Sequence, residues 1–356
     1  MNFKGKKILI TGHTGFKGSW LTLWLIKLGA KVIGYSLEPP TKPSLFEILN
    51  LKEKIVHIIG DIRDEEKLKN IFKKYKPEIV FHLAAQSLVR FSYKEPKLTY
   101  ETNVIGTLNV LEAVRETKSV RVVIIVTSDK CYENKEWVYG YRENDPLRGY
   151  DPYSSSKACA ELVVEAYRSS FFNPKNYGKG HQVALATVRA GNVIGGGDWQ
   201  VDRLIPDCVK ALSKGKPIKI RNPNAIRPWQ HVLEPLSGYL LLAQKMWEEP
   251  NKYCEAWNFG PYEKDIATVK EIVKKVINLW GKGKYEVESD TQFHEAGLLR
   301  LDISKAMIKL GWLPKWDLDT ALERTVKWYK LFYEKEDIFI YSIKEIEDYE
   351  KEMKVR

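Results

Sequence analysis

The first residues whose types and spacing could do chemistry are Tyr153 and Lys157, which stand four positions apart. Residues at this spacing share one face of a helix. A free tyrosine has a pKa of about 10, and a neighbouring ammonium group lowers that pKa toward the range useful for a proton acceptor. The pair is therefore a candidate acid–base couple. Tyr-x-x-x-Lys also occurs by chance in amphipathic helices, so it needs support from other residues.

A second cluster, Ser128, Asp129 and Lys130, directly follows the apolar run 121–127. Sheets of α/β proteins bind ligands at the carboxyl ends of their strands. A hydroxyl, a carboxylate and an ammonium group at such an end could move protons. The plainer interpretation is a turn that ends the strand, because Ser and Asp are common turn residues.

Glycines at positions 12, 15 and 18 follow G-x-x-G-x-x-G spacing between an apolar run and a helical pattern. Such glycines permit a tight turn and a close approach of the backbone to a pyrophosphate at a helix N-terminus, which predicts dinucleotide binding. Ser36 stands where an acid is expected at the end of the second strand, and Glu38 is the nearest carboxylate. No arginine lies near Ser36 in the sequence, which favours NAD over NADP.

The elements that must position these residues alternate along the first half of the chain. Strands buried on both faces read as short apolar runs, which is typical of a parallel sheet. We therefore predict an α/β fold with a Rossmann-type doubly wound parallel sheet and a smaller C-terminal substrate-binding lobe. The expected strands are residues 7–11, 31–36, 55–61, 78–84, 121–127 and 183–189, and the expected helices are 20–28, 64–75, 100–116, 153–172 and 204–213.

The character of the sequence changes after about residue 190, where loop-rich stretches separate short helices. This change predicts an NAD-binding domain over residues 1–190 and a lobe that mainly binds substrate over 191–330. A later segment near 229–260 is expected to return to the first domain. Residues 331–356 are expected to form a charged helical tail.

The formal charge of +11, from 57 basic and 46 acidic residues, raises the question of a nucleic-acid or membrane partner. The excess is spread over mixed-sign tracts such as 64–76 and 334–356, which are typical of solvated helix faces. Four scattered cysteines predict neither a disulfide framework nor a metal site. The most apolar stretch, 20–28, is too short to span a bilayer, and no signal peptide is evident, so we expect a cytoplasmic protein.

Taken together, these motifs resemble those of the extended short-chain dehydrogenase/reductase family, the epimerases and dehydratases that act on nucleotide sugars. The resemblance extends to about residue 328, and within the family it points to the CDP-glucose 4,6-dehydratases. The motifs that carry it are Gly12-x-x-Gly15-x-x-Gly18, Asp61-Ile62, His82-Leu83-Ala84-Ala85, Asn103, Ser128 and Tyr153-x-x-x-Lys157, with the stretches 11–21, 38–47, 128–134, 139–160 and 189–199.

The resemblance implies a lyase with bound NAD that makes CDP-4-keto-6-deoxy-D-glucose from CDP-D-glucose. Tyr153 would take the proton of the sugar's 4-hydroxyl as C4 is oxidised, with Lys157 lowering its pKa and Ser128 aligning the 4-oxygen. Water is then lost across C5 and C6, and the hydride returns to C6, which regenerates NAD. Such a product serves deoxysugar biosynthesis, including that of O-antigen lipopolysaccharide.

Asp129 and Lys130 are the informative pair within this resemblance. In the dTDP-glucose dehydratases the matching residues are Asp, which protonates the C6 hydroxyl, and Glu, which removes the C5 proton. Lys replaces that Glu in the CDP-glucose enzymes, as Lys130 does here. To act as a base, Lys130 would need a pKa lowered toward neutrality by burial and nearby positive charge. The alternative is a surface lysine without a role in catalysis.

Further contacts follow from the resemblance. The arginines are candidates because a diphosphate favours charge-assisted, bidentate partners, although each could instead serve in a structural ion pair. The implied cofactor-binding residues are Gly12, Thr14, Gly15, Phe16, Gly18, Asp61, Ile62, Leu83, Ala84, Ala85, Asn103, Tyr153 and Lys157. The candidates for the CDP-sugar are Gln86, Asn192, Arg203, Arg227 and Arg300.

The family commonly pairs through helices, so we expect a homodimer or homotetramer through 100–116 and 153–172. Two rival functions stay open at this point. One is another nucleotide-sugar dehydratase, 4-epimerase or reductase of the same family. The other is a catalytically silent protein that senses a dinucleotide and binds nucleic acid, which the presence of Ser128, Tyr153 and Lys157 disfavours. Nucleic acid, a membrane and a metal ion are not expected partners.

Overall fold

A seven-stranded parallel sheet forms the centre of the computed structural model, which describes residues 2–288 and 297–354. The strand order is β11-β6-β5-β4-β1-β2-β3, and every neighbouring pair is parallel. The predicted doubly wound Rossmann-type sheet is confirmed. Its strands are β1 (Lys7–Thr11), β2 (Lys31–Ser36), β3 (Val56–Ile59), β4 (Ile79–His82), β5 (Val122–Val126), β6 (Ala184–Ala190) and β11 (Ala256–Phe259).

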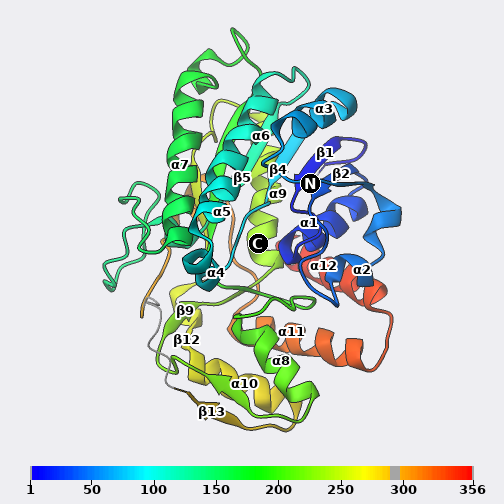
Figure 1. Cartoon of the computed structure of the whole chain (residues 1–356), viewed down its shortest axis with the longest axis vertical. Coiled ribbons are helices and arrows are strands. Elements are labelled where there is room, and N and C mark those ends of the chain that lie inside the picture. The colour runs from blue at the N-terminus through cyan, green and yellow to red at the C-terminus, as the bar shows by residue number, and fades with distance from the viewer. Residues whose placement is uncertain (1, 289–296, 355–356) are drawn as a thin grey trace.

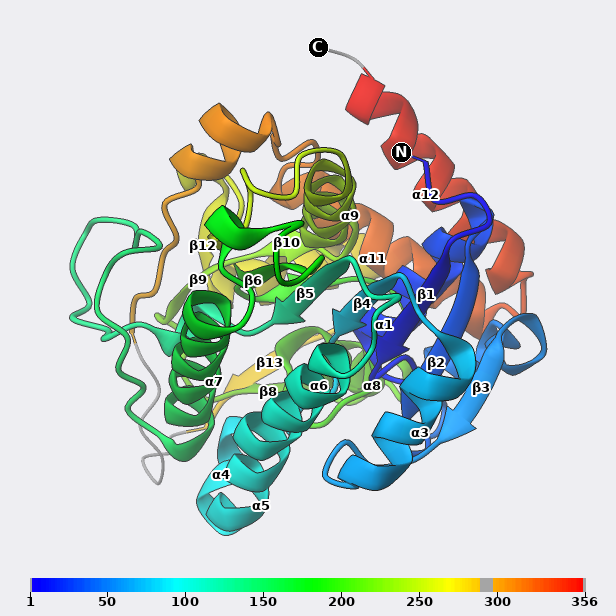
Figure 2. The same ribbon diagram turned by 90° about the horizontal axis from the view of Figure 1, so that it is seen from above.

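Successive side chains of each strand enter two separate hydrophobic cores. In β1, Ile8 and Ile10 join the core on one face, whereas Leu9 joins the core on the other. This alternation follows from the period of two in a strand and explains why the strands read as continuous apolar runs. Helices α1 (Phe16–Lys27) and α9 (Leu233–Glu248) cover the first face, and α3 (Glu65–Tyr75), α6 (Gly106–Arg115) and α7 (Pro152–Ser170) cover the second, as Figure 2 shows.

Helix boundaries follow capping residues that the sequence displays. The Asp64 side chain accepts a hydrogen bond from the Lys67 N–H at 3.0 Å and starts α3. Asp151 caps α7 in the same way, with Pro152 at the first helical position. The expected helix 100–116 is instead divided into α5 (Pro96–Tyr100), a π-helical turn (Glu101–Ile105) and α6, and α4 (Val89–Lys94) precedes it. Pro96 fixes the start of α5, which the apolar pattern alone did not reveal.

A smaller lobe lies at the carboxyl edge of the sheet, at the bottom of Figure 1. Two small sheets, β12–β9 and β13–β8, pack there beside helices. Meanwhile α9 and β11 belong to the central sheet layer, although they lie between lobe segments in the sequence. The division of the chain at residues 190 and 330 stays a prediction. The lobe comprises α8 (Leu204–Ser213), β8 (Ile218–Ile220), β9 (Ile226–Pro228), β12 (Ile266–Thr268), α10 (Val269–Trp280), β13 (Tyr285–Val287) and α11 (Leu318–Tyr333). Three further short elements are α2 (Leu45–Ile48), β7 (Val193–Ile194) and β10 (Gln230–His231).

The last helix, α12 (Ile338–Lys354), packs against α1 (Figure 1). The ring of Tyr349 lies 5.8 Å from that of Trp24, and the Trp24 indole N–H donates to Glu350 at 2.8 Å. Lys27 forms an ion pair with the same carboxylate at 2.8 Å. The charged segment that the sequence marked as a tail therefore covers the outer face of the first helix.

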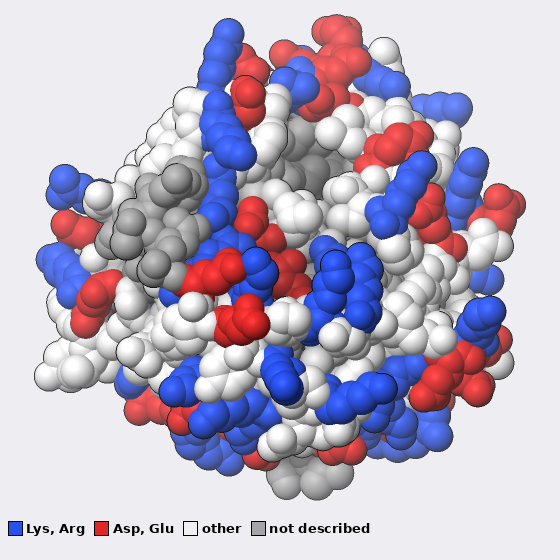
Figure 3. All heavy atoms as spheres, turned by 60° about the horizontal axis from the view of Figure 1, so that its bottom comes forward, with Lys and Arg blue, Asp and Glu red and all other residues white. Residues whose placement is uncertain are grey.

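The surface mixes basic and acidic side chains, with basic ones in the majority, over the face drawn in Figure 3. This agrees with the mixed-sign tracts of the sequence. No helix in the described ranges has both the length and the apolar character needed to cross a membrane. The four cysteines, Cys131, Cys159, Cys208 and Cys254, are free thiols.

Candidate active site

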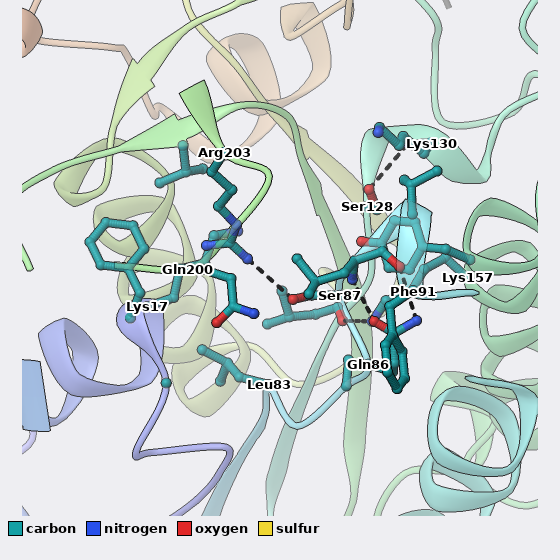
Figure 4. Close-up of a pocket in the computed structure, with 18 of the residues that line it drawn as sticks. Lys17, Leu83, Gln86, Ser87, Phe91, Ser128, Lys130, Lys157, Gln200 and Arg203 are labelled. Atoms are coloured by element: carbon teal, nitrogen blue, oxygen red, sulfur yellow. Dashed lines mark hydrogen bonds between the residues drawn. The ribbon is translucent and has the colours of Figure 1, made fainter. Parts of the chain in front are cut away.

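A cavity of about 1300 Å³ runs along the carboxyl edge of the sheet, between the sheet and the lobe. Its walls come from the glycine-rich turn after β1, the turns after β4 and β5, the first part of α7 and the segment that leads into α8. Ligands of open α/β sheets bind at this edge. Figure 4 shows a set of the side chains that line the cavity.

The glycine-rich turn forms a cradle that only glycine can complete. Gly12 has a φ of +76°, and a Cβ there would lie 2.7 Å from the Ala84 nitrogen. A Cβ on Gly18 would lie 2.1 Å from the Gly12 carbonyl oxygen, so this glycine sets the close packing of α1 on the turn. Gly15 begins α1 and no side chain caps it, which leaves the helix N-terminus open to the cavity. A pyrophosphate fits this end because free N–H groups and the helix dipole favour an anion.

The place of the missing acid at the end of β2 is filled by a chain of hydrogen bonds. Ser36 Oγ lies 2.8 Å from Thr14 Oγ1 and 3.1 Å from His13 Nδ1. His13 Nε2 in turn lies 2.7 Å from His57 Nδ1. Burial lowers the pKa of His13 to about 3, so its ring is neutral. This hydroxyl–imidazole chain was missed in the sequence, where the two histidines stand 44 positions apart.

At the far end of the cradle, Asp61 is already held by a neighbour. Arg63 Nη2 donates to Asp61 Oδ2 at 2.6 Å, and Arg63 Nη1 lies 3.5 Å from Glu101. The pKa of Asp61 is nevertheless lowered, because the hydrogen bonds and charge of Arg63 outweigh the effect of burial. Asp61 stays an acceptor, and one more donor can join it. Residues expected beside the cofactor that line the same cavity are Gly12, Thr14, Gly15, Phe16, Gly18, Asp61, Ile62, Leu83, Ala84, Ala85, Tyr153 and Lys157.

Tyr153 and Lys157 face the cavity from α7, and Ser128 faces it from the end of β5. The Lys157 ammonium donates to the Val126 carbonyl at 3.2 Å, and this bond holds the ammonium group at the carboxyl end of β5. Ser128 Oγ donates to Asp129 Oδ1 at 3.0 Å. It also accepts from the Lys130 N–H at 3.2 Å, as Figure 4 shows. The structure therefore brings together all five residues that the sequence marked as candidates for catalysis.

Burial is the largest cause of the pKa shifts among these residues. It raises the pKa of the Tyr153 phenol to about 12, while a hydrogen bond with Ser128 acts in the opposite direction. It lowers the pKa of Lys157 to about 8. Burial also raises the pKa of Asp129, whose Oδ2 is buried and has no hydrogen-bond partner among the described residues. A carboxyl group with a raised pKa and a free oxygen is suited to donate a proton.

Of the expected sugar-nucleotide residues, Gln86, Asn192, Arg203 and Arg227 line the cavity. Arg203 donates to Asp198 at 2.8 Å and to Ser87 at 3.1 Å, so it bridges the lobe to the turn after β4 (Figure 4). The Gln86 amide is used within its own loop, where it donates to Thr99 at 2.9 Å.

Asn103 and Arg300 are not among the described residues that line the cavity. The Asn103 amide accepts from the Gln86 N–H at 2.8 Å and donates to Ser156 Oγ at 2.8 Å, so it joins the cavity turn to α7 from behind. The Arg300 carbonyl accepts from the Tyr141 N–H at 3.0 Å. Both roles depend on partners far away in the sequence.

Lys17 is a cavity residue that the sequence-based prediction did not include. It lies in the first turn of α1, and burial lowers its pKa to about 8, with the charge of Arg203 acting in the same direction. A lysine inside the glycine motif was the signal that could have identified it. No cluster of three or more His, Cys, Asp or Glu side chains in the described ranges could hold a metal ion.

A Rossmann-type sheet, a pyrophosphate cradle and a Ser–Tyr–Lys group in one cavity define a nucleotide-dependent oxidoreductase or lyase. The family model of GDP-mannose 4,6 dehydratase matches residues 9–325, and the chain belongs to this family. The resemblance inferred from the sequence motifs is thereby confirmed.

Individual relatives agree with this assignment. A CDP-glucose 4,6-dehydratase of Salmonella typhimurium is 56% identical over 348 residues, which cover 98% of this chain and 97% of that protein. A crystal structure of dTDP-glucose 4,6-dehydratase from Bacillus anthracis in complex with NAD is similar with a TM-score of 0.78, at 25% identity, over 94% of this chain and 100% of that chain. A UDP-glucose 4-epimerase from Thermotoga maritima with UDP-glucose gives a TM-score of 0.79, also at 25% identity, over 92% and 99%.

Proposed function

We propose that this chain is a lyase that converts CDP-D-glucose to CDP-4-keto-6-deoxy-D-glucose, with NAD as its cofactor. The observation that carries the proposal is the 56% identity to a CDP-glucose 4,6-dehydratase, which extends over 98% of the chain. The glycine cradle and the open start of α1 fit the pyrophosphate of NAD. The glycine cradle would hold NAD, which would supply the hydride acceptor for oxidation at C4 of the sugar and the hydride donor for reduction at C6.

Tyr153 accepts the proton of the 4-hydroxyl group in this reaction. Burial raises its pKa to about 12, so it needs positive charge beside it to act as a base. Arg203 lowers that pKa, and Lys157, one helical turn away on α7, adds a second cation. Ser128 lies within hydrogen-bond reach of Tyr153 and aligns the 4-oxygen.

Asp129 and Lys130 perform the loss of water. Asp129 donates a proton to the departing C6 hydroxyl, which its raised pKa and unpaired oxygen favour. Lys130 lines the cavity on the same turn and removes the proton from C5. An epimerase or reductase has no need of this second acid–base pair, which is why the dehydratase function is favoured over these alternatives.

The sugar nucleotide lies between the sheet and the lobe. Arg203 and Arg227 bind its diphosphate, because guanidinium groups form charge-assisted bonds with phosphate oxygens. Gln86 and Asn192 border the same space. Arg300 lies outside the cavity lining, so we expect it to affect substrate binding only through the segment around Tyr141 that its carbonyl anchors.

The test is direct. Enzyme incubated with NAD and CDP-glucose should give a product 18 mass units lighter (one water) by mass spectrometry, with the alkali-induced near-ultraviolet absorbance of a 4-keto-6-deoxy sugar. Parallel incubations use dTDP-glucose, UDP-glucose and GDP-mannose. Turnover of another nucleotide sugar in place of CDP-glucose would overturn the substrate assignment. A product of unchanged mass would indicate an epimerase.

The chain is further proposed to form homodimers through residues 100–116 and 153–172, on which pairs of dimers could build a homotetramer. Large apolar side chains are exposed on this side, including Ile105 at 47% and Leu162 at 53%. Light scattering after size exclusion should give twice or four times the chain mass, and Leu162→Glu should reduce it to one chain mass. An unchanged mass in the variant would contradict this interface. The four free thiols agree with a reducing compartment, and we propose the cytoplasm.

A further inference from the structure

A buried ion pair lies within the catalytic wall, which is the side of the cavity formed by β5, β6 and α7, and it is outside the cavity lining. Arg189 on β6 donates to Glu161 on α7 at 2.7 Å, and both side chains are only 3% exposed. Neither residue is part of the proposed chemistry. A charge pair removed from water in this way is expensive unless its remaining atoms are also satisfied, so its surroundings are informative.

The Glu161 carboxylate joins three elements of the catalytic wall. It accepts from Thr127 at the end of β5 and from the Thr187 hydroxyl on β6, the latter at 2.8 Å. Thr127 directly precedes Ser128, and Glu161 stands one helical turn after Lys157. These bonds therefore fix the distance between the helix that carries Tyr153 and the strand end that carries Ser128.

The Arg189 guanidinium extends the same network toward the acid–base turn. It donates to the Tyr132 hydroxyl at 2.7 Å and to the Glu143 carbonyl at 3.1 Å. Tyr132 immediately follows the one-turn helix Asp129–Cys131, which carries Asp129 and Lys130. One buried pair thus reaches both halves of the proposed catalytic group.

We propose that Glu161 and Arg189 are positioning residues for the reaction: they hold α7 against the ends of β5 and β6, and the Glu161 carboxylate keeps the Lys157 ammonium charged beside Tyr153. This inference rests on the proposed function, because it assigns a consequence to the roles of Tyr153 and Lys157. It is distinct from a purely structural role, since it predicts a change in protonation as well as in stability.

The electrostatic part follows from the groups around Lys157. Burial lowers its pKa to about 8, and the charge of Glu161 acts in the opposite direction. Loss of that carboxylate therefore lowers the pKa of Lys157 further, and a smaller fraction is charged at neutral pH. The other titratable or charged groups around this site are Tyr153 on α7, Asp129 and Cys131 on the turn after β5, His82 on β4, Lys17 on α1 and Arg203 before α8.

None of these neighbours can replace Glu161 in setting the pKa of Lys157. Burial lowers the pKa of His82 to about 3, so its ring is neutral over the pH range of interest. Burial raises the pKa of Cys131 well above its usual range, with Glu161 acting in the same direction, so Cys131 stays a thiol. Lys17 titrates near pH 8, as Lys157 does, but its shift comes from burial and from other charges. Among these groups that change charge near neutral pH, a change at Glu161 should therefore move the titration of Lys157.

The experiment compares Glu161→Gln with two variants that keep the charge. Turnover needs charged Lys157, so kcat falls as the pH rises through the pKa of Lys157. In E161Q this alkaline limb of the kcat profile should move to lower pH by about one unit or more. Glu161→Asp keeps the carboxylate, and Thr187→Val removes only one hydrogen bond. Both should lose stability and some kcat while their alkaline limbs stay at the wild-type pH.

A measurement without substrate separates this inference from the proposed function. In protein labelled with ¹³C at lysine Cε, the resonance of Lys157 is assigned by its loss in Lys157→Met, and its titration gives the pKa directly. E161Q should show a lower pKa than wild type whether or not CDP-glucose is the substrate. An unchanged pKa of Lys157 and an unchanged alkaline limb would overturn the proposal.

Unpaired Arg189 could prevent E161Q from folding, so the double variant E161Q/R189Q provides a second route. It removes both charges and leaves no buried cation without a partner. Its alkaline limb should shift in the same direction, because the carboxylate that acts on Lys157 is gone. If neither neutral variant folds, the pair serves folding alone and the proposal is wrong.

Discussion

The two walls of the cavity are built in different ways. The catalytic wall, formed by β5, β6 and α7, holds Tyr153 and Lys157 on a helix and Ser128 two residues after the end of β5, and Lys157 bonds to the last residue of that strand. The substrate wall, formed by residues 191–230, presents Arg203 and Arg227 from loops and a short strand. Arg203 is anchored on Asp198 and Ser87, on opposite sides of the cavity.

This difference matches the two tasks. Proton and hydride transfer require atoms held to within a fraction of an ångström, which a sheet and a packed helix provide. Recognition of a nucleotide needs contacts that can form as the ligand enters, and loops allow such adjustment. Substitutions in the catalytic wall should therefore lower kcat, whereas substitutions in the substrate wall should raise KM.

The largest effect is expected for Tyr153→Phe. Removal of the hydroxyl should lower kcat about 10³-fold, within the range of general acid–base catalysis, while affinity for CDP-glucose changes little. Product formation gives kcat, and calorimetry gives the affinity. Tyr139→Phe is the control, since Tyr139 is exposed and lies outside the cavity lining. Retention of more than a tenth of the wild-type rate in Y153F would remove this residue from the chemistry.

Lys130→Met tests whether the catalytic wall contains two separable functions. Without the C5 base, dehydration should fall about 10²-fold. Oxidation at C4 should persist, seen as absorbance at 340 nm in a single turnover. Lys135→Met, on the exposed loop nearby, should behave as wild type. If dehydration is undiminished in K130M, Lys130 is a bystander and Asp129 acts with another base.

Arg203→Met is the corresponding test of the substrate wall. Loss of a charge-assisted contact worth about 1.5–3 kcal/mol should raise KM for CDP-glucose about 10- to 100-fold. Arg203 also lowers the pKa of Tyr153, but kcat should fall only a few-fold because Lys157 still supplies positive charge beside Tyr153. Arg221→Met is the matched control, because Arg221 pairs with Asp202 at 3.1 Å and does not line the cavity. A large fall in kcat at unchanged KM would place Arg203 with the catalytic wall instead.

The smallest effect is expected at a buried carboxylate outside the catalytic wall, which shows by contrast what hydrogen-bond partners contribute to a buried carboxylate within it. Glu161 has three donors, whereas Glu345 on α12 is 1% exposed and both of its oxygens lack hydrogen-bond partners among the described residues. Burial raises the pKa of Glu345 from 4.5 to about 8. The unfolded chain therefore releases this proton first, and stability falls as pH rises from about 4.5 to about 8.

Replacement by glutamine removes this penalty. Glu345→Gln should raise the Tm by about 3 °C at pH 8 and by progressively less toward pH 5. The measurement is thermal unfolding at several pH values, with the exposed Glu347→Gln as the control. A Tm difference that is independent of pH would show that Glu345 is already ionised in the folded protein.

Much of this arrangement could be predicted from the sequence because it depends on local pattern. Apolar runs located the strands to within a few residues, and the glycine spacing identified the cradle. Tyr153 and Lys157 needed only helical spacing, and Ser128 only the rule that ligands bind at strand ends. Parallel strands then bring these pieces to one edge.

The rest depends on partners that are distant in the sequence. Asn103 was expected beside the cofactor, but its amide is engaged by Gln86 and by Ser156, which stands 53 positions away. The bond between Glu161 and Arg189 spans 28 positions and two elements, with no motif to mark it. A side chain's type shows which bonds it can form, but only the folded chain selects the partner.

The contact between α1 and α12 also has a consequence for how the protein is made. The bond from Trp24 to Glu350 joins residues 326 positions apart. A ribosome releases α1 early and α12 late, so Trp24 lacks its partners Tyr349 and Glu350 while nearly the whole chain is synthesised. The cofactor half can therefore finish its packing only after the lobe has been translated, and a stalled or shortened chain would present an apolar helix face to chaperones.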